Sequence, residues 1–176
     1  PKSRTHCPAE HRCAPRRTAP AHCLLKAAHS LPGASGRVLT CCHAFGPVGH
    51  LALEEVASPV PGPRQAVVTI KAAGVNFPDT LIVQGKYQIK PELPFTPGAE
   101  FAGIVKAVGE GVSNVKPGDP VLGVGVTGGF AEEALIDAAS LVPLPAGADF
   151  EVAAALTMAY GTSLHALKDR ARLAPG

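Results

Sequence analysis

The sequence predicts a mainly β fold, a small irregular barrel with helices at its C-terminal end. The chain has 176 residues, enough for one domain and a tail. It contains 19 glycines and 18 prolines but only 5% aromatic residues. These glycines and prolines separate short apolar runs at regular spacing, which is typical of a barrel with tight corners.

Several segments alternate apolar and polar residues, as half-buried strands do. The clearest is Ala66-Val-Val-Thr-Ile-Lys-Ala72, which ends near Gly74. Glycines at 103, 123 and 125 fit bends within strands. In chain order we expect strands over 37–43, 51–56, 66–72, 100–108, 120–124 and 130–136, and an extended segment over 140–145.

Two regions favour helices. Phe77-Pro78-Asp79 predicts a short helix through Val83, because proline suits the first turn and an acid suits the positive helix end. Asp79 is therefore expected to be a cap. After Gly147, apolar residues recur at helical spacing, with Asp149 as the expected N-cap. We expect Gly161 to interrupt this pattern and a second helix to follow over 163–172.

The first 37 residues differ from the rest. They carry seven Lys or Arg and one Glu, a net charge of +6. Because the whole chain has a net charge of +2, residues 38–176 carry −4. The globular part is therefore mildly acidic and does not show the excess of basic residues that is typical of a nucleic-acid-binding domain. The composition of 1–37 favours disorder; a targeting peptide and a metal site on Cys7, His11, Cys13 and Cys23 stay open, although no C-x₂-C pair is present. We divide the chain into this tail, a barrel over 38–147 and helices over 148–176.

All five cysteines lie within the first 42 residues, so disulfide bonds between them cannot cross-link the body of the barrel. We expect free thiols and a cytoplasmic location. No apolar run is long enough to predict a membrane span.

The order of several motifs carries a family resemblance. They are Ala72-Ala-Gly-Val-Asn-Phe-Pro-Asp-Thr80, Gln84-Gly-Lys-Tyr87, Pro97-Gly-Ala-Glu-Phe-Ala-Gly103, Val108-Gly-Glu-Gly111, Gly128-Gly-Phe-Ala-Glu132 and the run from Ala153 to Ser163. Together they resemble the medium-chain dehydrogenase/reductase superfamily, in its zinc-independent, zeta-crystallin-like NADPH:quinone oxidoreductase branch. The resemblance spans about 38–176.

The resemblance implies an alcohol dehydrogenase-like N-terminal domain, which is a GroES-like barrel, then crossing helices and a Rossmann domain that binds NADPH. No G-x-G-x-x-G follows a strand here. We therefore expect only the N-terminal part, with the Rossmann domain missing and the chain alone inactive. The resemblance also implies a homodimeric parent.

The resemblance suggests three site residues and no metal. Zinc-dependent relatives have Cys where Asn76 stands and His where Ala99 stands, and neither residue here can bind zinc. Asn76 is expected to contact the nicotinamide end of NADPH; the alternative is a turn residue. Tyr87 matches a tyrosine that lines the active site in quinone reductases and is thought to donate a proton in enoyl reductases; the alternative is a packing role. Thr162 matches a threonine near the cofactor; the alternative is an ordinary helix hydroxyl.

Other polar residues are expected to be structural. Glu100 matches a family glutamate beside the active site, with a structural role here. Glu132 and Glu133 are expected to be solvated, His165 to lie at the surface or be packed, and Tyr160 to lie in the core. The apolar side chains expected on the face that a further domain would cover are Val152, Leu156, Leu164 and Leu167.

The implied reaction is hydride transfer from NADPH to a quinone or enone. Such an acceptor is already electrophilic and needs placement more than a metal. Two alternatives stay open, an enoyl-thioester reductase and a non-catalytic binding module.

Overall fold

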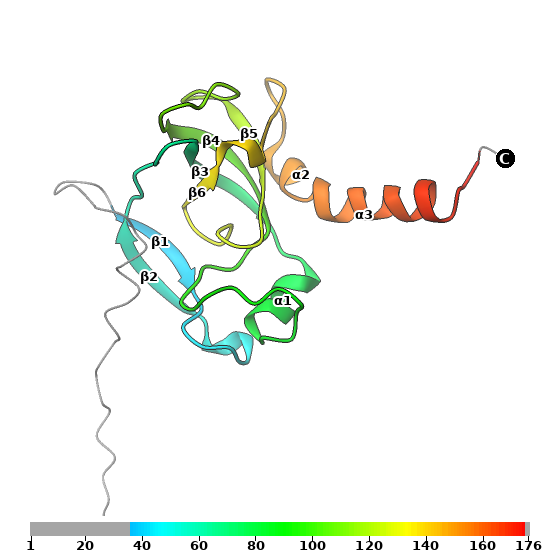
Figure 1. Cartoon of the computed structure of the whole chain (residues 1–176), viewed down its shortest axis with the longest axis horizontal. Coiled ribbons are helices and arrows are strands. Elements are labelled where there is room, and N and C mark those ends of the chain that lie inside the picture. The colour runs from blue at the N-terminus through cyan, green and yellow to red at the C-terminus, as the bar shows by residue number, and fades with distance from the viewer. Residues whose placement is uncertain (1–35, 175–176) are drawn as a thin grey trace, which may run out of the picture.

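The computed structural model describes residues 36–174, so the prediction for most of the 1–37 tail lies outside the described residues. Two antiparallel sheets form the body (Figure 1). The smaller pairs β1 (Gly36–Cys41) with β2 (Ala52–Ala57). The larger has the order β6-β3-β4-β5-β7. Its strands are β3 (Gln65–Gly74), β4 (Glu100–Val108), β5 (Pro120–Val124), β6 (Glu133–Asp137) and β7 (Leu141–Pro143).

The mainly β prediction is confirmed, and the strands differ from expectation mostly at their ends. β1 begins at Gly36, inside the segment assigned to the tail. The strand expected over 130–136 begins only at Glu133, because residues 130–132 join the two sheets instead. Thr40 N donates to Phe130 O and Glu132 N donates to Val38 O, both at 2.9 Å. Ile70 N donates to Glu132 O at 2.9 Å, so this segment bonds to β1 and to β3 at once.

The main core lies against the larger sheet. Phe101 is its largest side chain and is 1% exposed. The other buried members are Ala66, Val68, Val105, Val115, Val121, Ala134, Ala138 and Leu141. Aliphatic side chains that alternate along strands account for this burial, as the pattern of 66–72 predicts.

Gly103 marks a close approach of two strands. The register of β3 against β4 shifts between Ile70 and Ala72, which is a bulge beside Gly103. A Cβ on Gly103 would lie 2.1 Å from the backbone oxygen of Thr69. Only glycine fits here, which agrees with the predicted bend.

The short helix α1 (Phe77–Val83) forms as predicted. Its inner side chains, Ile82 and Val83, are buried in a second cluster with Cys42 and Phe95. The 3₁₀ turn η1 (Val48–His50) lies between β1 and β2, and a second 3₁₀ turn, η2 (Ala138–Ser140), precedes β7. This second cluster, Cys42, Ile82, Val83 and Phe95, is called the α1 cluster. It is separate from the main core, and it connects α1 to the end of the hairpin formed by β1 and β2.

The C-terminal helices are α2 (Phe150–Ala154), the π-helical η3 (Leu156–Tyr160), α3 (Gly161–Leu164) and the π-helical η4 (His165–Arg170). Asp149 caps α2 as predicted, since its Oδ1 accepts from the Glu151 and Val152 amides. The helical interruption expected at Gly161 is wrong. Gly161 has helical φ and ψ of −61° and −44°. The irregular residue is Ala155, with φ −99° and ψ 0°.

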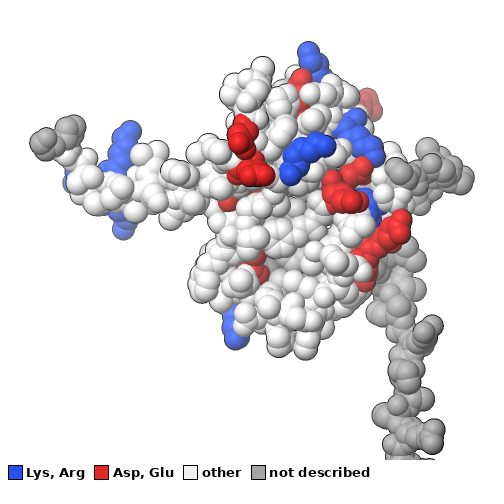
Figure 2. Space-filling view, turned by 180° about the vertical axis from the view of Figure 1, so that it is seen from behind, with Lys and Arg blue, Asp and Glu red and all other residues white. Residues whose placement is uncertain are grey.

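Only the start of this helical arm packs on the barrel. Ala153 and Ala154 are buried against Ala102, and the rest projects away (Figure 1). The exposed apolar side chains include the four expected ones and Tyr160, whose predicted core position is wrong; they are Val152, Leu156, Tyr160, Leu164 and Leu167. No Lys, Arg, Asp or Glu lies between Leu156 and Leu164, and the middle of the arm is white in Figure 2. Among the described residues, none of the helices has the length and apolar character needed to cross a membrane.

Replacing Gly103 by alanine is expected to destabilise the barrel by at least about 2 kcal/mol, because the new methyl group would overlap the Thr69 carbonyl. Urea unfolding followed by circular dichroism measures this difference.

Gly161→Ala is the matched control. A Cβ at Gly161 would meet nothing within 4 Å. Alanine in a helix interior is expected to stabilise by about 0.5–1 kcal/mol. Equal effects of the two substitutions would contradict the close approach at Gly103.

The exposed apolar side chains of the arm form a row, Val152, Leu156, Tyr160, Leu164 and Leu167. This row is expected to drive concentration-dependent self-association of the 176-residue chain, because contiguous apolar patches associate in water. Sedimentation velocity over a concentration series measures it. Leu156→Lys with Leu164→Lys should give a monomer. His165→Lys is the control: it adds a cation outside the row and should leave the self-association unchanged. A wild-type monomer at every concentration would refute the expectation.

Candidate functional site

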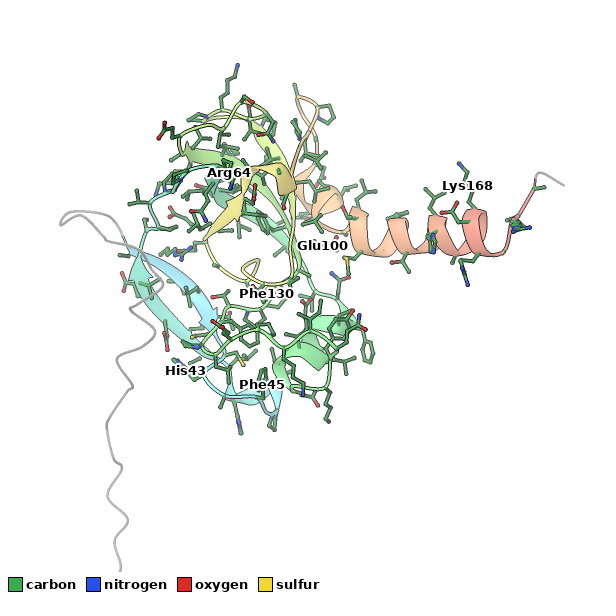
Figure 3. All side chains as sticks on the ribbon, viewed as in Figure 1. His43, Phe45, Arg64, Glu100, Phe130 and Lys168 are labelled. Atoms are coloured by element: carbon green, nitrogen blue, oxygen red, sulfur yellow. The ribbon has the colours of Figure 1, made fainter. Side chains whose placement is uncertain are left out.

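A buried carboxylate, Glu100, lies where the barrel meets the C-terminal helices (Figure 3). It begins β4 and is 1% exposed. Its Oε1 accepts a hydrogen bond from Asn76 Nδ2 at 3.0 Å, and its Oε2 accepts one from the Met158 backbone amide at 2.9 Å. One side chain therefore joins the start of α1, the sheet and the helical arm.

Gly74 makes room for this junction. It pairs with Glu100 across β3 and β4. A Cβ there would lie 2.5 Å from Ala154 O and 2.6 Å from Glu100 Oε1. The Ala-Gly step before Asn76 thus lets the helical arm approach the sheet.

A second buried carboxylate, Asp79, lies beside the first. Its Oδ2 accepts from the Asn76 backbone amide at 2.8 Å, which confirms the predicted cap. Asp79 is 3% exposed, however, and its Oδ1 is buried without a hydrogen-bond partner. Burial raises the pKa of Asp79; the amides of Asn76, Ala99 and Gly98 oppose this, and the nearby Glu100 adds to it. Asp79 is thus more than an exposed cap.

Asn76 is half-buried, and its amide is oriented by Glu100. This is compatible with a contact to the nicotinamide end of NADPH. Ala99 is 6% exposed and contributes only a methyl group. An amide and a methyl group do not fit zinc, which needs thiolate, imidazole or carboxylate ligands. That no metal binds at these two positions stays a prediction.

Tyr87 and Thr162 lie outside this hydrogen-bonded group. The half-buried Tyr87 packs against the cluster of Cys42, Ile82, Val83 and Phe95. Thr162 is exposed on α3. The structure therefore brings Asn76, Asp79 and Glu100 together, whereas neither predicted role for Tyr87 or Thr162 is tested by it.

Sequence reasoning missed a charged group at the sheet edge. Lys106 Nζ lies 2.5 Å from Glu133 Oε1, and Glu133 is 9% exposed. Arg37 Nη1 donates to the Glu133 backbone oxygen. Burial lowers the pKa of Arg37, opposed by the Glu133 charge. The solvated position expected for Glu133 is wrong, whereas Glu132 is exposed. Glu133 is the first residue of β6 and pairs with Thr69 of β3, whereas Glu132 lies in the segment before that strand.

Residues 62–146 match the alcohol dehydrogenase GroES-like domain. The barrel belongs to the medium-chain dehydrogenase/reductase superfamily. Quinone oxidoreductase-like protein 2 of Rattus norvegicus is 43% identical over 126 residues, 72% of this chain and 36% of the relative. The human synaptic vesicle membrane protein VAT-1 homolog is 43% identical over 120 residues, 68% of this chain and 30% of the relative. The chain thus spans about a third of the length of these relatives.

Solved structures of the superfamily share the fold. Escherichia coli quinone oxidoreductase, in complex with NADPH, has a TM-score of 0.66 and 33% identity, covering 76% of this chain and 41% of its own. CurK enoyl reductase has a TM-score of 0.69 and 26% identity, covering 81% and 45%. The described residues themselves contain no doubly wound parallel sheet, as the prediction of a chain without a Rossmann domain requires.

Asp79→Asn is expected to remove a pH-dependent part of the stability. A raised pKa means that the folded state holds this proton more tightly than the unfolded chain, where the ordinary value is 3.8. The contribution is full below the unfolded pKa and is lost as pH rises through the folded pKa. Wild type should therefore lose stability relative to Asp79→Asn between about pH 4 and pH 7, measured by urea unfolding.

Glu151→Gln removes an exposed carboxylate and controls for the loss of one negative charge. The account of Asp79 fails if the wild type and Asp79→Asn differ by the same amount at both pH values.

Proposed function

We propose that this chain is the substrate-side part of an NADPH-dependent quinone oxidoreductase. The observation that supports this most is the bridge from Asn76 through Glu100 to Met158. It holds a side-chain amide in one orientation at the edge of a buried junction. A quinone oxidoreductase-like relative and a solved quinone oxidoreductase complexed with NADPH support the same chemistry.

The chemistry needs positioning more than activation. When bound, NADPH supplies a hydride. The quinone gains that hydride and becomes a hydroquinone anion, which then takes one proton. Asn76 would hold the carboxamide of the nicotinamide, because an amide offers both a donor and an acceptor. Glu100 would fix that amide so that no reorganisation is needed when the cofactor arrives.

Tyr87 would donate the proton or hydrogen-bond the product anion. The α1 cluster restrains its ring, which would keep the phenol in place. Thr162 would line the cofactor side from α3. A zinc-free active site, a cytoplasmic location and a homodimeric parent belong to the same proposal.

Two other functions have specific support. The likeness to CurK enoyl reductase favours an enoyl-thioester acceptor, which would use the same hydride and proton steps. The 43% identity to a synaptic vesicle membrane protein, the VAT-1 homolog, keeps a non-catalytic binding module as the third candidate. The acceptor that is reduced separates all three.

The test measures NADPH oxidation by the longest product of the gene that contains these residues, with a quinone and with an enoyl thioester. We expect a higher kcat/KM for the quinone. Tyr87→Phe should lower kcat about 100-fold with a smaller effect on KM, as for the loss of a general acid. Asn76→Ala should raise KM for NADPH.

Tyr160→Phe is the matched control, because it removes the hydroxyl of the chain's other tyrosine, exposed on η3. The 176-residue chain alone should show no saturable NADPH binding at micromolar concentration by fluorescence titration. Faster turnover of the thioester would favour the enoyl reductase, and no oxidation of NADPH with either acceptor would favour the binding module.

A further inference from the structure

We propose that the β1–β2 hairpin holds a Zn²⁺ ion on Cys41, His43 and Glu54. One ligand atom from each residue, the thiol sulfur, an imidazole nitrogen and a carboxylate oxygen, lies within 4.8 Å of the other two. The inference is independent of the proposed reductase function.

The hairpin register places the three side chains together. Cys41 ends β1 and pairs with Ala52, and Leu39 pairs with Glu54. Paired residues point to the same face, so Cys41 and Glu54 are diagonal neighbours on one face. His43 is two residues beyond Cys41 and reaches the same carboxylate, since its Nε2 contacts Glu54 Oε1. The same face carries Arg37 at the far end of β1 and the apolar side chains of Leu39, Ala52 and Val56. A carboxylate and an imidazole beside Cys41 therefore favour a polar role for this end of the face.

The backbone around the ligands is fixed on both sides. Cys42 N donates to Phe95 O at 2.8 Å, and Phe95 N donates back to Cys42 O at 3.2 Å. Gly46 N donates to Val83 O at 3.0 Å. The segment from Cys41 to Gly46 is therefore held before any ion binds, which reduces the cost of ordering the ligands.

The three proposed ligands differ in exposure, from the buried Cys41 to the exposed His43. Cys41 is 1% exposed, whereas the side chains of Glu54 and His43 are 29% and 39% exposed. An ion could enter past His43 and Glu54 and reach a shielded sulfur. This leaves one coordination position facing solvent, where water completes a tetrahedron.

The donor set favours zinc over other common cations. Sulfur and imidazole disfavour Mg²⁺ and Ca²⁺, which prefer oxygen, whereas zinc accepts all three donor types. Zinc bonds of about 2.0–2.3 Å place tetrahedral ligand atoms about 3.5 Å apart. The observed spread needs shifts of about 1 Å, within reach of side-chain rotation. On binding, Cys41 loses its proton, and the His43–Glu54 contact is replaced by two bonds to the ion.

This site differs from the positions where zinc-dependent relatives bind the metal. His43 lies at the hairpin and Glu100 at the helical junction, well apart in Figure 3. The sequence predicted a barrel without metal from Asn76 and Ala99 alone, and the proposal departs from that prediction at other residues.

The test uses the full chain with Cys7, Cys13 and Cys23 changed to Ser, so that tail thiols cannot bind the ion. Titration with Co²⁺ should give a thiolate-to-cobalt charge-transfer band at one ion per chain. Zn²⁺ should displace the cobalt and bind with Kd of about 1 µM or tighter in calorimetry. Zn²⁺ should also raise Tm, because it binds the folded state.

Cys41→Ser should abolish the band, and His43→Ala and Glu54→Ala should each raise Kd at least about tenfold. The controls are Cys42→Ser, which removes the neighbouring thiol in the α1 cluster, and His50→Ala at η1; both should keep binding. His43 is exposed, so its variant should fold even if Cys41→Ser does not. Absence of the band, or unchanged Zn²⁺ affinity in His43→Ala, would overturn the proposal.

Discussion

The carboxylate of Glu100 is the interaction on which the candidate site depends. A buried charge is costly unless it is hydrogen-bonded, and both oxygens of Glu100 accept bonds, one from Asn76 and one from Met158. Removing the carboxylate would leave the Asn76 amide and the Met158 N–H without their partner. The same atom group therefore orients a candidate cofactor ligand and fixes the start of the helical arm. Gly74 belongs to this constraint, because any side chain there would displace Glu100 or the backbone of Ala154.

The parts that follow from local sequence were predictable. The alternation of 66–72, the Pro-Asp start of α1 and the Asp149 cap each act within a few residues, and all three are present. The parts set by distant contacts were not. Gly161 continues a helix because nothing around it forces a turn, whereas the irregularity falls at Ala155, beside the packed Ala153 and Ala154. The inward turn of Glu133 depends on its pairing with Thr69 and on Lys106, which local patterning could not specify.

The residues of the candidate site were predictable from the sequence, but the hydrogen bonds that join them were not. Motif order pointed to Asn76 and Tyr87, and Glu100 was expected to be structural. Glu100 also bonds to Met158, 58 residues beyond it in the chain, and only the fold shows that this links Asn76 to the helical arm. The buried, half-satisfied Asp79 also needed it, since a carboxylate at a helix start usually faces water. Burial raises the pKa of Asp79, one of whose oxygens is buried without a hydrogen-bond partner, and the charge of the neighbouring Glu100 adds to the rise.

The hairpin and the reductase residues are connected through the α1 cluster. Cys41 is the proposed zinc ligand, and the next residue, Cys42, packs with Ile82, Val83 and Phe95. Tyr87 packs against this same cluster. An ion on Cys41 would therefore restrain the backbone behind the Tyr87 ring without contacting any substrate. If both proposals hold, the ion acts as a positioning element: Zn²⁺ removal would loosen Tyr87 and lower kcat, whereas Asn76, held by Glu100 at the other end, would bind NADPH as before.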